Sequence, residues 1–270
     1  MTAFWPHGLG DSRADKIGTD RPGHVRLFLI RHGATTGSAR HVLAGRTDVD
    51  LSSVGRRQAR ELAAYLATWP LSAIYSSPQK RAHKTALAVA ADRPATPLIL
   101  CEDLRELDLG MVEGLTAWEA SRRWPHLVET ALDQATRDFA FPEGESWSAA
   151  ERRARRALSM IVRAHQAGET VAVVTHGAIL GFVLARYSNE GRGAWRRYQP
   201  RHGTVSSVAA GTREGDLWLL PIAIDVSDFW TRRLRTAVLL RKTRPPSPET
   251  DHASRAYNIR SRGLRTRRSG

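Results

Sequence analysis

Two histidines follow apolar runs in closely similar sequence contexts. His32 ends the run at 27–30 in LFLIRHG, and His176 ends the run at 171–174 in VAVVTHG. Imidazole can act as a nucleophile, and the glycine after each histidine allows the backbone to approach a ligand closely. In open α/β sheets, ligands bind beyond the carboxyl ends of the strands, so both histidines are expected at one site.

Two arginines and one carboxylate occupy comparable positions. Arg31 precedes the first histidine, Arg81 lies near the start of a predicted helix, and Glu106 follows a third predicted strand in LRELDLGMVEGL. Arginine presents forked N–H donors that match phosphate oxygens, and a carboxylic acid can protonate a leaving oxygen. Singly, each residue type is typical of an ordinary surface or structural side chain. Their joint placement at strand ends favours phosphoryl transfer.

Short apolar runs predict the strands that would position these residues. Strands are expected at 25–30, 71–76, 98–101, 170–175, 205–209 and 217–224. Helices are expected at about 53–69, 80–91, 116–124, 147–166 and 178–187, with Ser53 as an N-cap and Gly168 at a C-cap position. Buried strands that alternate with helices indicate a three-layer α/β/α sandwich with a mostly parallel central sheet.

The composition is that of a globular protein, with positive charge concentrated near one end. The chain has 270 residues, 41% hydrophobic and 25% charged, and a single cysteine, which excludes collagen-like, disulfide-rich and wholly disordered classes. The net charge of +14 suggests anionic partners. Residues 231–270 hold 12 basic and 2 acidic residues, so 29 basic and 25 acidic residues remain in 1–230.

Composition also predicts the domain organisation and compartment. We expect a disordered N-terminal extension at 1–24, a catalytic domain at 25–235 and a basic disordered tail at 236–270. No apolar run approaches the ~18 residues of a membrane span, and the N-terminal residues lack the apolar core of a secretory signal. A cytoplasmic protein with no membrane partner is therefore expected.

The order of the motifs resembles the histidine phosphatase superfamily, also called the phosphoglycerate mutase-like family. The resemblance covers about residues 25–228 and rests on RHG with Thr35, SSP at 76–78 with Arg81, LRELDLGMVEG, FPEGES at 141–146, HG at 176–177, HGT at 202–204 and DLSSVGRRQA at 50–59. It implies a phosphoglycerate mutase-like fold with a small helical cap near 110–150. LRELDLGMVEG and FPEGES resemble the broad-specificity and α-ribazole phosphate phosphatase branch.

The resemblance also implies catalytic roles. His32 would attack phosphorus to give a phosphohistidine, and Glu106 would protonate the leaving alkoxide and then take a proton from water. Arg31, Arg81 and His176 would hold the non-bridging oxygens. No metal and no cofactor are expected, because guanidinium and imidazolium groups would supply the positive field.

Three further residues are predicted to bind substrate. They are Thr35, Ser38 and Gly177. The family often reads RHG-(Glu/Gln)-Thr-x-x-Asn, and here Ala34 and Ser38 occupy the Glu/Gln and Asn positions. Ser38 is shorter than Asn but keeps a hydroxyl that can donate to phosphate.

The expected activity is hydrolysis of a small phosphorylated metabolite. Glu106 and His176 are 70 positions apart, a compact spacing that resembles the phosphatases. Phosphoglycerate mutase-type transfer, and polyanion binding through the Arg-rich tail, are the alternatives. The oligomeric state stays open between monomer and dimer. Four aromatic residues of the cap segment are expected to pack the cap, with stacking on a substrate ring as the alternative: Trp118, Trp124, Phe139 and Trp147.

Overall fold

The computed structural model describes residues 23–133, 136, 138–188 and 192–226. Its strands are β1 (Val25–Arg31), β2 (Ala73–Ser76), β3 (Leu98–Leu100), β4 (Thr170–Thr175), β5 (Val205–Arg213) and β6 (Asp216–Val226). They form one sheet in the order β3-β2-β4-β1-β5-β6. The first four pair in parallel, whereas β5 pairs antiparallel with both β1 and β6. The expected tail at 236–270, and all but two residues of the expected extension at 1–24, lie outside the described residues.

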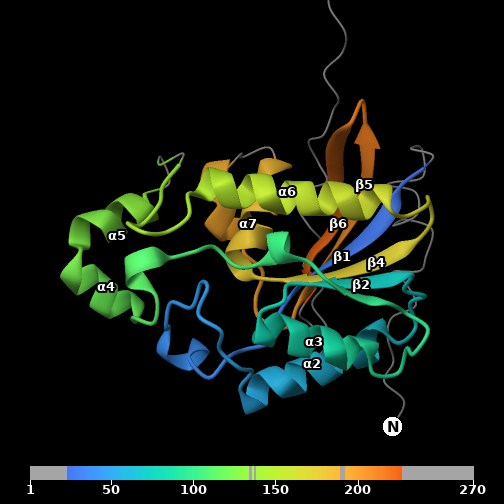
Figure 1. Ribbon diagram of the computed structural model, residues 1–270, viewed down its shortest axis with the longest axis horizontal. Helices are drawn as coiled ribbons and strands as arrows, with labels where there is room; N and C mark the ends of the chain where they lie inside the picture. Colours follow the sequence, from blue (N-terminus) through green and yellow to red (C-terminus); the bar gives the residue numbers. More distant parts are fainter. Residues whose placement is uncertain (1–22, 134–135, 137, 189–191, 227–270) are drawn as a thin grey trace, which may run out of the picture. The chain divides into compact units, whose positions relative to one another are not determined.

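The predicted three-layer α/β/α sandwich is confirmed (Figure 1). The helices are α2 (Ser53–Leu66), α3 (Lys80–Ala90), α4 (Ala117–Arg123), α5 (Pro125–Leu132), α6 (Trp147–Arg163) and α7 (Gly177–Arg186), with short 3-10 helices η1 (Ser38–Arg40), η2 (Glu102–Leu104), η3 (Gly110–Val112) and η4 (Arg192–Tyr198). α2 and α3 lie on one face of the sheet, and α6 and α7 lie on the other (Figure 1). Within the described ranges, no helix combines the length and apolar character that crossing a bilayer requires.

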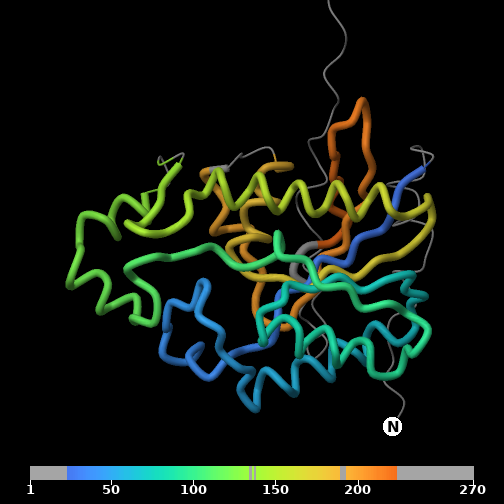
Figure 2. Tube along the Cα trace, in the orientation of Figure 1, coloured from blue at the N-terminus to red at the C-terminus, as the bar shows by residue number. Residues whose placement is uncertain are grey.

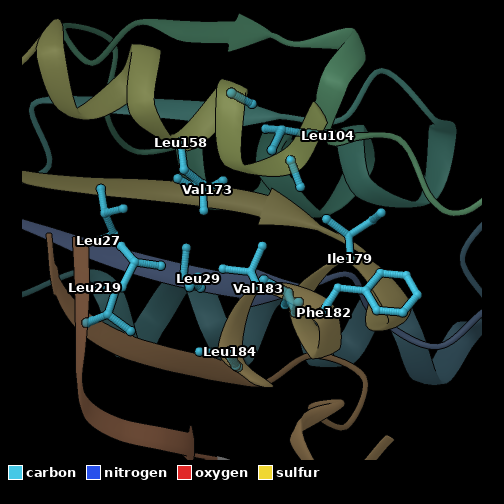
Figure 3. Close-up of a cluster of buried hydrophobic side chains, with 14 of the residues drawn as sticks. Leu27, Leu29, Leu104, Leu158, Val173, Ile179, Phe182, Val183, Leu184 and Leu219 are labelled. Atoms are coloured by element: carbon cyan, nitrogen blue, oxygen red, sulfur yellow. The ribbon is translucent and has the colours of Figure 1, made fainter. Parts of the chain in front are cut away.

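The alternation of side chains along β1 explains why both faces are covered. Phe28 and Ile30 pack into the hydrophobic cluster formed with α2 and α3, whereas Leu27 and Leu29 belong to the cluster formed with α6 and α7. Figure 3 shows the second cluster, in which Leu27 and Leu29 lie among residues such as Leu158. Burial on both faces fixes the register of the central strands.

The predicted helical cap is formed by α4 and α5. The chain leaves β3, runs out to these two helices and returns to α6 (Figure 2). Thr116 begins α4 with a capping box: its hydroxyl accepts from the backbone N–H of Glu119, whose carboxylate accepts from the backbone N–H of Thr116. Backbone bonds between Leu43 and residues 114 and 115 join the cap segment to the loop after β1.

Three local expectations differ from the structure. The N-cap of α2 is Ser52, not Ser53, because its hydroxyl accepts from the N–H of Gly55 three residues on. α6 ends at Arg163, and Gly168 lies in the turn before β4 with φ +90°. The sequence pattern does not predict α5, because eight residues carry too short an apolar repeat.

Candidate functional site

The central strands bring the two histidines together. β1 and β4 are neighbouring parallel strands with Arg31 opposite Thr175, so the next residue on each strand reaches the same sheet edge. The N–H of His32 donates to the carbonyl of Thr175 at 3.0 Å. Both imidazoles are buried, and their ring centroids lie 5.0 Å apart. The predicted convergence of His32 and His176 is therefore present.

His32 is held as a neutral imidazole with one defined tautomer. Its Nδ1 lies 2.7 Å from the carbonyl oxygen of Gly33. Because a carbonyl only accepts hydrogen bonds, Nδ1 carries the proton and Nε2 carries the lone pair. Burial, with the nearby charges of Arg81 and other neighbours, lowers the pKa of His32 well below 6.5. The ring is therefore neutral at neutral pH, with Nε2 as a potential nucleophile.

The turn that carries His32 is braced by α2 and α3. The N–H of Gly33 donates to Thr85 Oγ1 at 3.2 Å, and the N–H of Ala34 donates to Gln58 Oε1 at 2.8 Å. A Cβ on Gly33 would lie 2.5 Å from the carbonyl oxygen of Gly55, so the turn and α2 approach closely. The DLSSVGRRQA motif thus acts by positioning the RHG turn.

His176 is fully buried behind His32. Its Nε2 lies 2.8 Å from Ser77 Oγ, which also accepts from the N–H of Gln79. The Ser77 hydroxyl has one proton and two lone pairs, so this contact fits either tautomer of the His176 ring. Within the described residues, Nδ1 is buried and has no hydrogen-bond partner. Burial, Arg81 and His32 lower the pKa of His176 well below 6.5, which favours a neutral ring.

Arg81 is buried and oriented by backbone carbonyls. Its Nη1 donates to Thr47 at 2.8 Å, and its Nη2 donates to Ala44 at 2.9 Å and to Gly45 at 2.7 Å. Burial lowers the pKa of Arg81 from its usual value, and the charge of Glu106 opposes that shift. A guanidinium with an ordinary pKa above 12 remains charged under these conditions. The loop at 44–47 therefore fixes one positive charge at the site.

Glu113 in turn holds that loop. Its Oε1 accepts from the N–H of Arg46 at 2.6 Å, and its Oε2 accepts from the N–H of Gly45 at 3.1 Å. Oε2 also accepts from the N–H and the hydroxyl of Thr47, at 3.2 and 2.6 Å. The carboxylate thus gathers the loop whose carbonyls hold Arg81. Glu113 belongs to the LRELDLGMVEG segment, and its role in holding this loop was not predicted from the sequence.

Arg31 is held by a residue that the sequence analysis did not predict as part of the site. Its Nη1 donates to the carbonyl of Pro200 at 2.6 Å, and its Nη2 donates to His202 Nε2 at 3.0 Å. Burial, Arg31 and Arg81 lower the pKa of His202 to about 3, so its ring is neutral and accepts at Nε2. The His202 and His32 rings lie 5.3 Å apart. The HGT segment was the available signal, since it follows the same turn pattern as the two HG motifs.

Glu106 lies beside the N-terminus of α7. Its Oε1 accepts from the N–H of Leu107 at 2.9 Å, and its Oε2 accepts from the N–H of Ala178 at 3.2 Å. Arg153 holds the backbone of the same segment by donating to the Glu106 carbonyl at 3.0 Å. Glu145 binds Arg153 through both carboxylate oxygens, each at 2.7 Å. FPEGES thus supplies Glu145, the partner of Arg153 in a largely buried ion pair that positions the Glu106 segment.

Thr35, Ser38 and Gly177, which are predicted to bind substrate, have defined places in the structure. Thr35 and Ser38 bond each other, with the Thr35 N–H donating to Ser38 Oγ at 2.8 Å and the two hydroxyl oxygens 2.9 Å apart. A Cβ on Gly177 would lie 2.5 Å from Gln199 Nε2 and 2.7 Å from Arg31 Cζ. Because Gly177 has no side chain, it leaves room for the Arg31 guanidinium and so helps to position it.

A cavity of about 680 Å³ opens over these groups. It is lined by Arg31, His32, Thr35, Ser38, Arg81, Glu106, Gln199 and His202 together with side chains of the cap. His176 and Gly177 lie behind this lining rather than on it. Across the residues that the structure describes, no group of three or more His, Cys, Asp or Glu residues is arranged to hold a metal ion. The arrangement combines a neutral nucleophile, two guanidinium groups and one carboxylate.

Comparison with known proteins gives a consistent result. The histidine phosphatase superfamily (branch 1) matches residues 27–220. Phosphoglycerate mutase-like protein 4 of Arabidopsis thaliana is 32% identical over 221 residues, which are 81% of this chain and 92% of that protein. The metal-independent phosphoserine phosphatase of the same plant is 35% identical over 60% of this chain and 68% of that protein. The solved structure of Bacillus stearothermophilus YhfR is 29% identical, with a TM-score of 0.64, over 73% of this chain and 96% of that one.

Proposed function

Because the chain belongs to branch 1 of the histidine phosphatase superfamily, we propose that it hydrolyses small phosphomonoesters through a covalent phosphohistidine on His32. Family membership makes it an enzyme with phosphatase or mutase activity on phosphorylated substrates. The proposal of a phosphohistidine on His32 rests on the tautomer of that ring. Nδ1 donates to Gly33, which leaves a neutral, buried Nε2 beside two arginines. That is the protonation state that an attack on phosphorus requires.

The first half-reaction transfers the phosphoryl group to the enzyme. Arg31 and Arg81 bind the non-bridging oxygens, and the lone pair of His32 Nε2 forms a bond to phosphorus. The bond from phosphorus to the ester oxygen breaks, and protonated Glu106 gives its proton to that oxygen. The hydrogen bond from Nδ1 to Gly33 stabilises the positive charge that the ring gains.

The second half-reaction restores the enzyme. Glu106, now a carboxylate, takes a proton from water while the water oxygen bonds to phosphorus. The bond between Nε2 and phosphorus breaks, and its electron pair returns to the ring. Arg31 and Arg81 donate to the phosphoryl oxygens in both steps, whereas the His176 ring lies behind the cavity lining. Each oriented donor of this kind contributes about 3–4 kcal/mol to transition-state stabilisation.

The first test is hydrolysis of p-nitrophenyl phosphate with and without EDTA. The wild-type protein should turn over in EDTA, and His32→Ala should lose turnover by at least about 10³-fold. His126→Ala is the matched control, because its side chain is 95% exposed on α5. Rapid quenching should trap an acid-labile, alkali-stable phosphoenzyme in the wild-type protein and none in His32→Ala. Full activity in His32→Ala would refute the phosphohistidine mechanism, and inactivation by EDTA would refute metal independence.

Phosphoglycerate mutase-type transfer is the second candidate function. The similarity to phosphoglycerate mutase-like protein 4 favours it, since the two chains match over 92% of that protein. Exchange of phosphate between the 2- and 3-positions of phosphoglycerate should outpace release of free phosphate if the enzyme is a mutase. Release without exchange would exclude that function. The expected polyanion contact of the tail concerns residues outside the described ranges, and deletion of 241–270 tests it by loss of binding with turnover retained.

A further inference from the structure

Gln79 is a buried polar residue that lies between Arg81 and Glu106 and has no part in the two half-reactions. It is the N-cap residue of α3, and it is 3% exposed. Its side chain makes no capping hydrogen bond to the helix. A buried carboxamide costs free energy unless its oxygen and its NH₂ group both find partners. The partners of Gln79 therefore indicate what the side chain does.

The two ends of the carboxamide bind two different segments of the site. Oε1 accepts from the backbone N–H of Glu106 at 2.8 Å. Nε2 donates to the carbonyl of Gly45 at 2.8 Å and to that of Arg46 at 3.3 Å. A backbone N–H only donates and a carbonyl only accepts, so this position requires an acceptor and a donor side by side. A carboxamide meets that requirement, whereas a carboxylate or an apolar side chain does not.

The carbonyl of Gly45 is shared by Gln79 and Arg81. Arg81 Nη2 donates to this oxygen at 2.7 Å, so the two side chains hold the same peptide group. A Cβ on Gly45 would collide with the carbonyl oxygen of Leu107, the residue after Glu106. The loop that orients Arg81 therefore packs directly against the segment that carries the acid, and Gln79 bonds to both where they meet.

The backbone of Glu106 is held on both of its sides. Gln79 accepts from its N–H, and Arg153 donates to its carbonyl at 3.0 Å. The Gln79 contact differs from the Arg153 contact because it also reaches the loop that orients Arg81. A general acid must lie within about 2.6–3.2 Å of the oxygen that it protonates. The spacing between Arg81 and Glu106 therefore decides whether the acid reaches the leaving oxygen of a phosphate that Arg81 binds.

We propose that Gln79 is a positioning residue that sets the spacing between Arg81, which binds phosphate, and Glu106, which protonates the leaving oxygen. The role rests on the proposed function, because that function places the phosphate and the leaving oxygen at these two residues. Gln79 lies outside the cavity lining, so it acts through them and not on the substrate. Loss of its carboxamide should impair protonation of the leaving oxygen more than binding of phosphate.

Two esters that each carry one aromatic ring test this role in Gln79→Met. Methionine keeps the length of the side chain but makes neither set of hydrogen bonds. p-Nitrophenolate leaves as a stabilised anion, whereas the alkoxide of benzyl phosphate has to be protonated as it leaves. We expect kcat/KM to fall by about 10²-fold for benzyl phosphate and by less than about tenfold for p-nitrophenyl phosphate.

The ratio of the two kcat/KM values separates positioning from a general structural defect. In Gln79→Met the ratio should shift by at least about tenfold in favour of p-nitrophenyl phosphate. Gln166→Met is the matched control, because Gln166 is exposed and lies outside the cavity lining. Equal losses on both esters in a folded Gln79→Met protein would overturn the proposal.

A shorter carboxamide covers the case in which Gln79→Met does not fold. Gln79→Asn keeps the chemical group but lacks one methylene of reach, and asparagine is a favoured N-cap residue. It should show the same shift of the ratio, because it cannot span Glu106 and Gly45 at once. An unchanged ratio in folded Gln79→Asn would also overturn the proposal.

A double variant tests whether the effect passes through Glu106. Glu106→Gln removes the acid, so adding Gln79→Met to it should change the ratio by less than about twofold. A further shift of about tenfold would show that Gln79 acts by another route and would overturn the proposal.

The outcomes also distinguish the two proposals. Turnover that depends on His32 together with an unchanged ester ratio would overturn the role of Gln79 alone. Absence of turnover in the wild-type protein would refute the proposed function and the role of Gln79 with it.

Discussion

Replacing Glu113 with glutamine should loosen the loop that holds Arg81. In the structure, Oε1 accepts from the N–H groups of Arg46 and Leu109, and Oε2 accepts three bonds from Gly45 and Thr47. Glutamine keeps one accepting oxygen, and its NH₂ group would face backbone N–H donors. Glu113→Gln therefore removes at least two of the five hydrogen bonds while conserving side-chain size.

The expected loss of stability follows from the number of lost hydrogen bonds. A hydrogen bond to a charged group contributes at least about 1.5 kcal/mol, so two lost bonds should lower the free energy of unfolding by about 3 kcal/mol. The effect on catalysis is separate. Arg81 donates to three carbonyls of this loop, and displacement of a phosphate-binding group by about 1 Å lowers activity by about 10²-fold. We expect kcat/KM to fall by roughly tenfold to a hundredfold.

Urea denaturation measures the free energy of unfolding, and steady-state hydrolysis of p-nitrophenyl phosphate measures kcat/KM. Kinetics must be measured at a temperature where circular dichroism shows the variant to be folded. Glu129→Gln is the matched control, because its side chain is 74% exposed and its ion pair with His126 is a surface contact. A destabilised Glu113→Gln protein with kcat/KM within about twofold of the wild type would refute the reasoning, because Arg81 would then keep its position without this loop.

Three further predictions follow from the buried groups. The folded-state pKa of His202 is lowered to about 3, so between that value and about 6.5 the unfolded chain binds a proton that the folded chain does not. The free energy of unfolding should therefore fall by about 1.4 kcal/mol per histidine for each unit by which the pH is lowered through this range. Urea denaturation from pH 7.5 downwards should show this slope, and His202→Gln should reduce it; an unchanged slope would argue against a neutral His202. Gly177→Ala places a Cβ 2.7 Å from Arg31 Cζ and should lower kcat/KM by about 10²-fold, and near-normal kinetics would contradict that crowding. Arg153→Met leaves the partly buried Glu145 carboxylate without its arginine partner and should lower the free energy of unfolding by about 3–5 kcal/mol. The double variant Glu145→Gln with Arg153→Met should recover part of this loss. Additive losses in the double-mutant cycle would contradict the coupling between the two residues.

Short-range patterns in the sequence were enough to predict much of the fold. The apolar runs that became β1 and β4 are buried on both faces, and such runs are recognisable without a tertiary model. β4 has the predicted bounds of 170–175. The placement of His32 and His176 at one sheet edge followed, because parallel neighbouring strands end on the same side.

Only the tertiary structure decided how the site is supported. The carbonyls that bind Arg81 come from 44–47, and the nitrogen that binds Arg31 comes from His202, far along the chain. No periodicity encodes such pairs, since they depend on which loops the folded sheet brings together. The neutral state of His32 is likewise a consequence of burial and of neighbouring charges. The sequence by itself determined which residue types stand at the strand ends, and the packing of distant segments decided the tautomer of His32 and which side chains line the cavity over it.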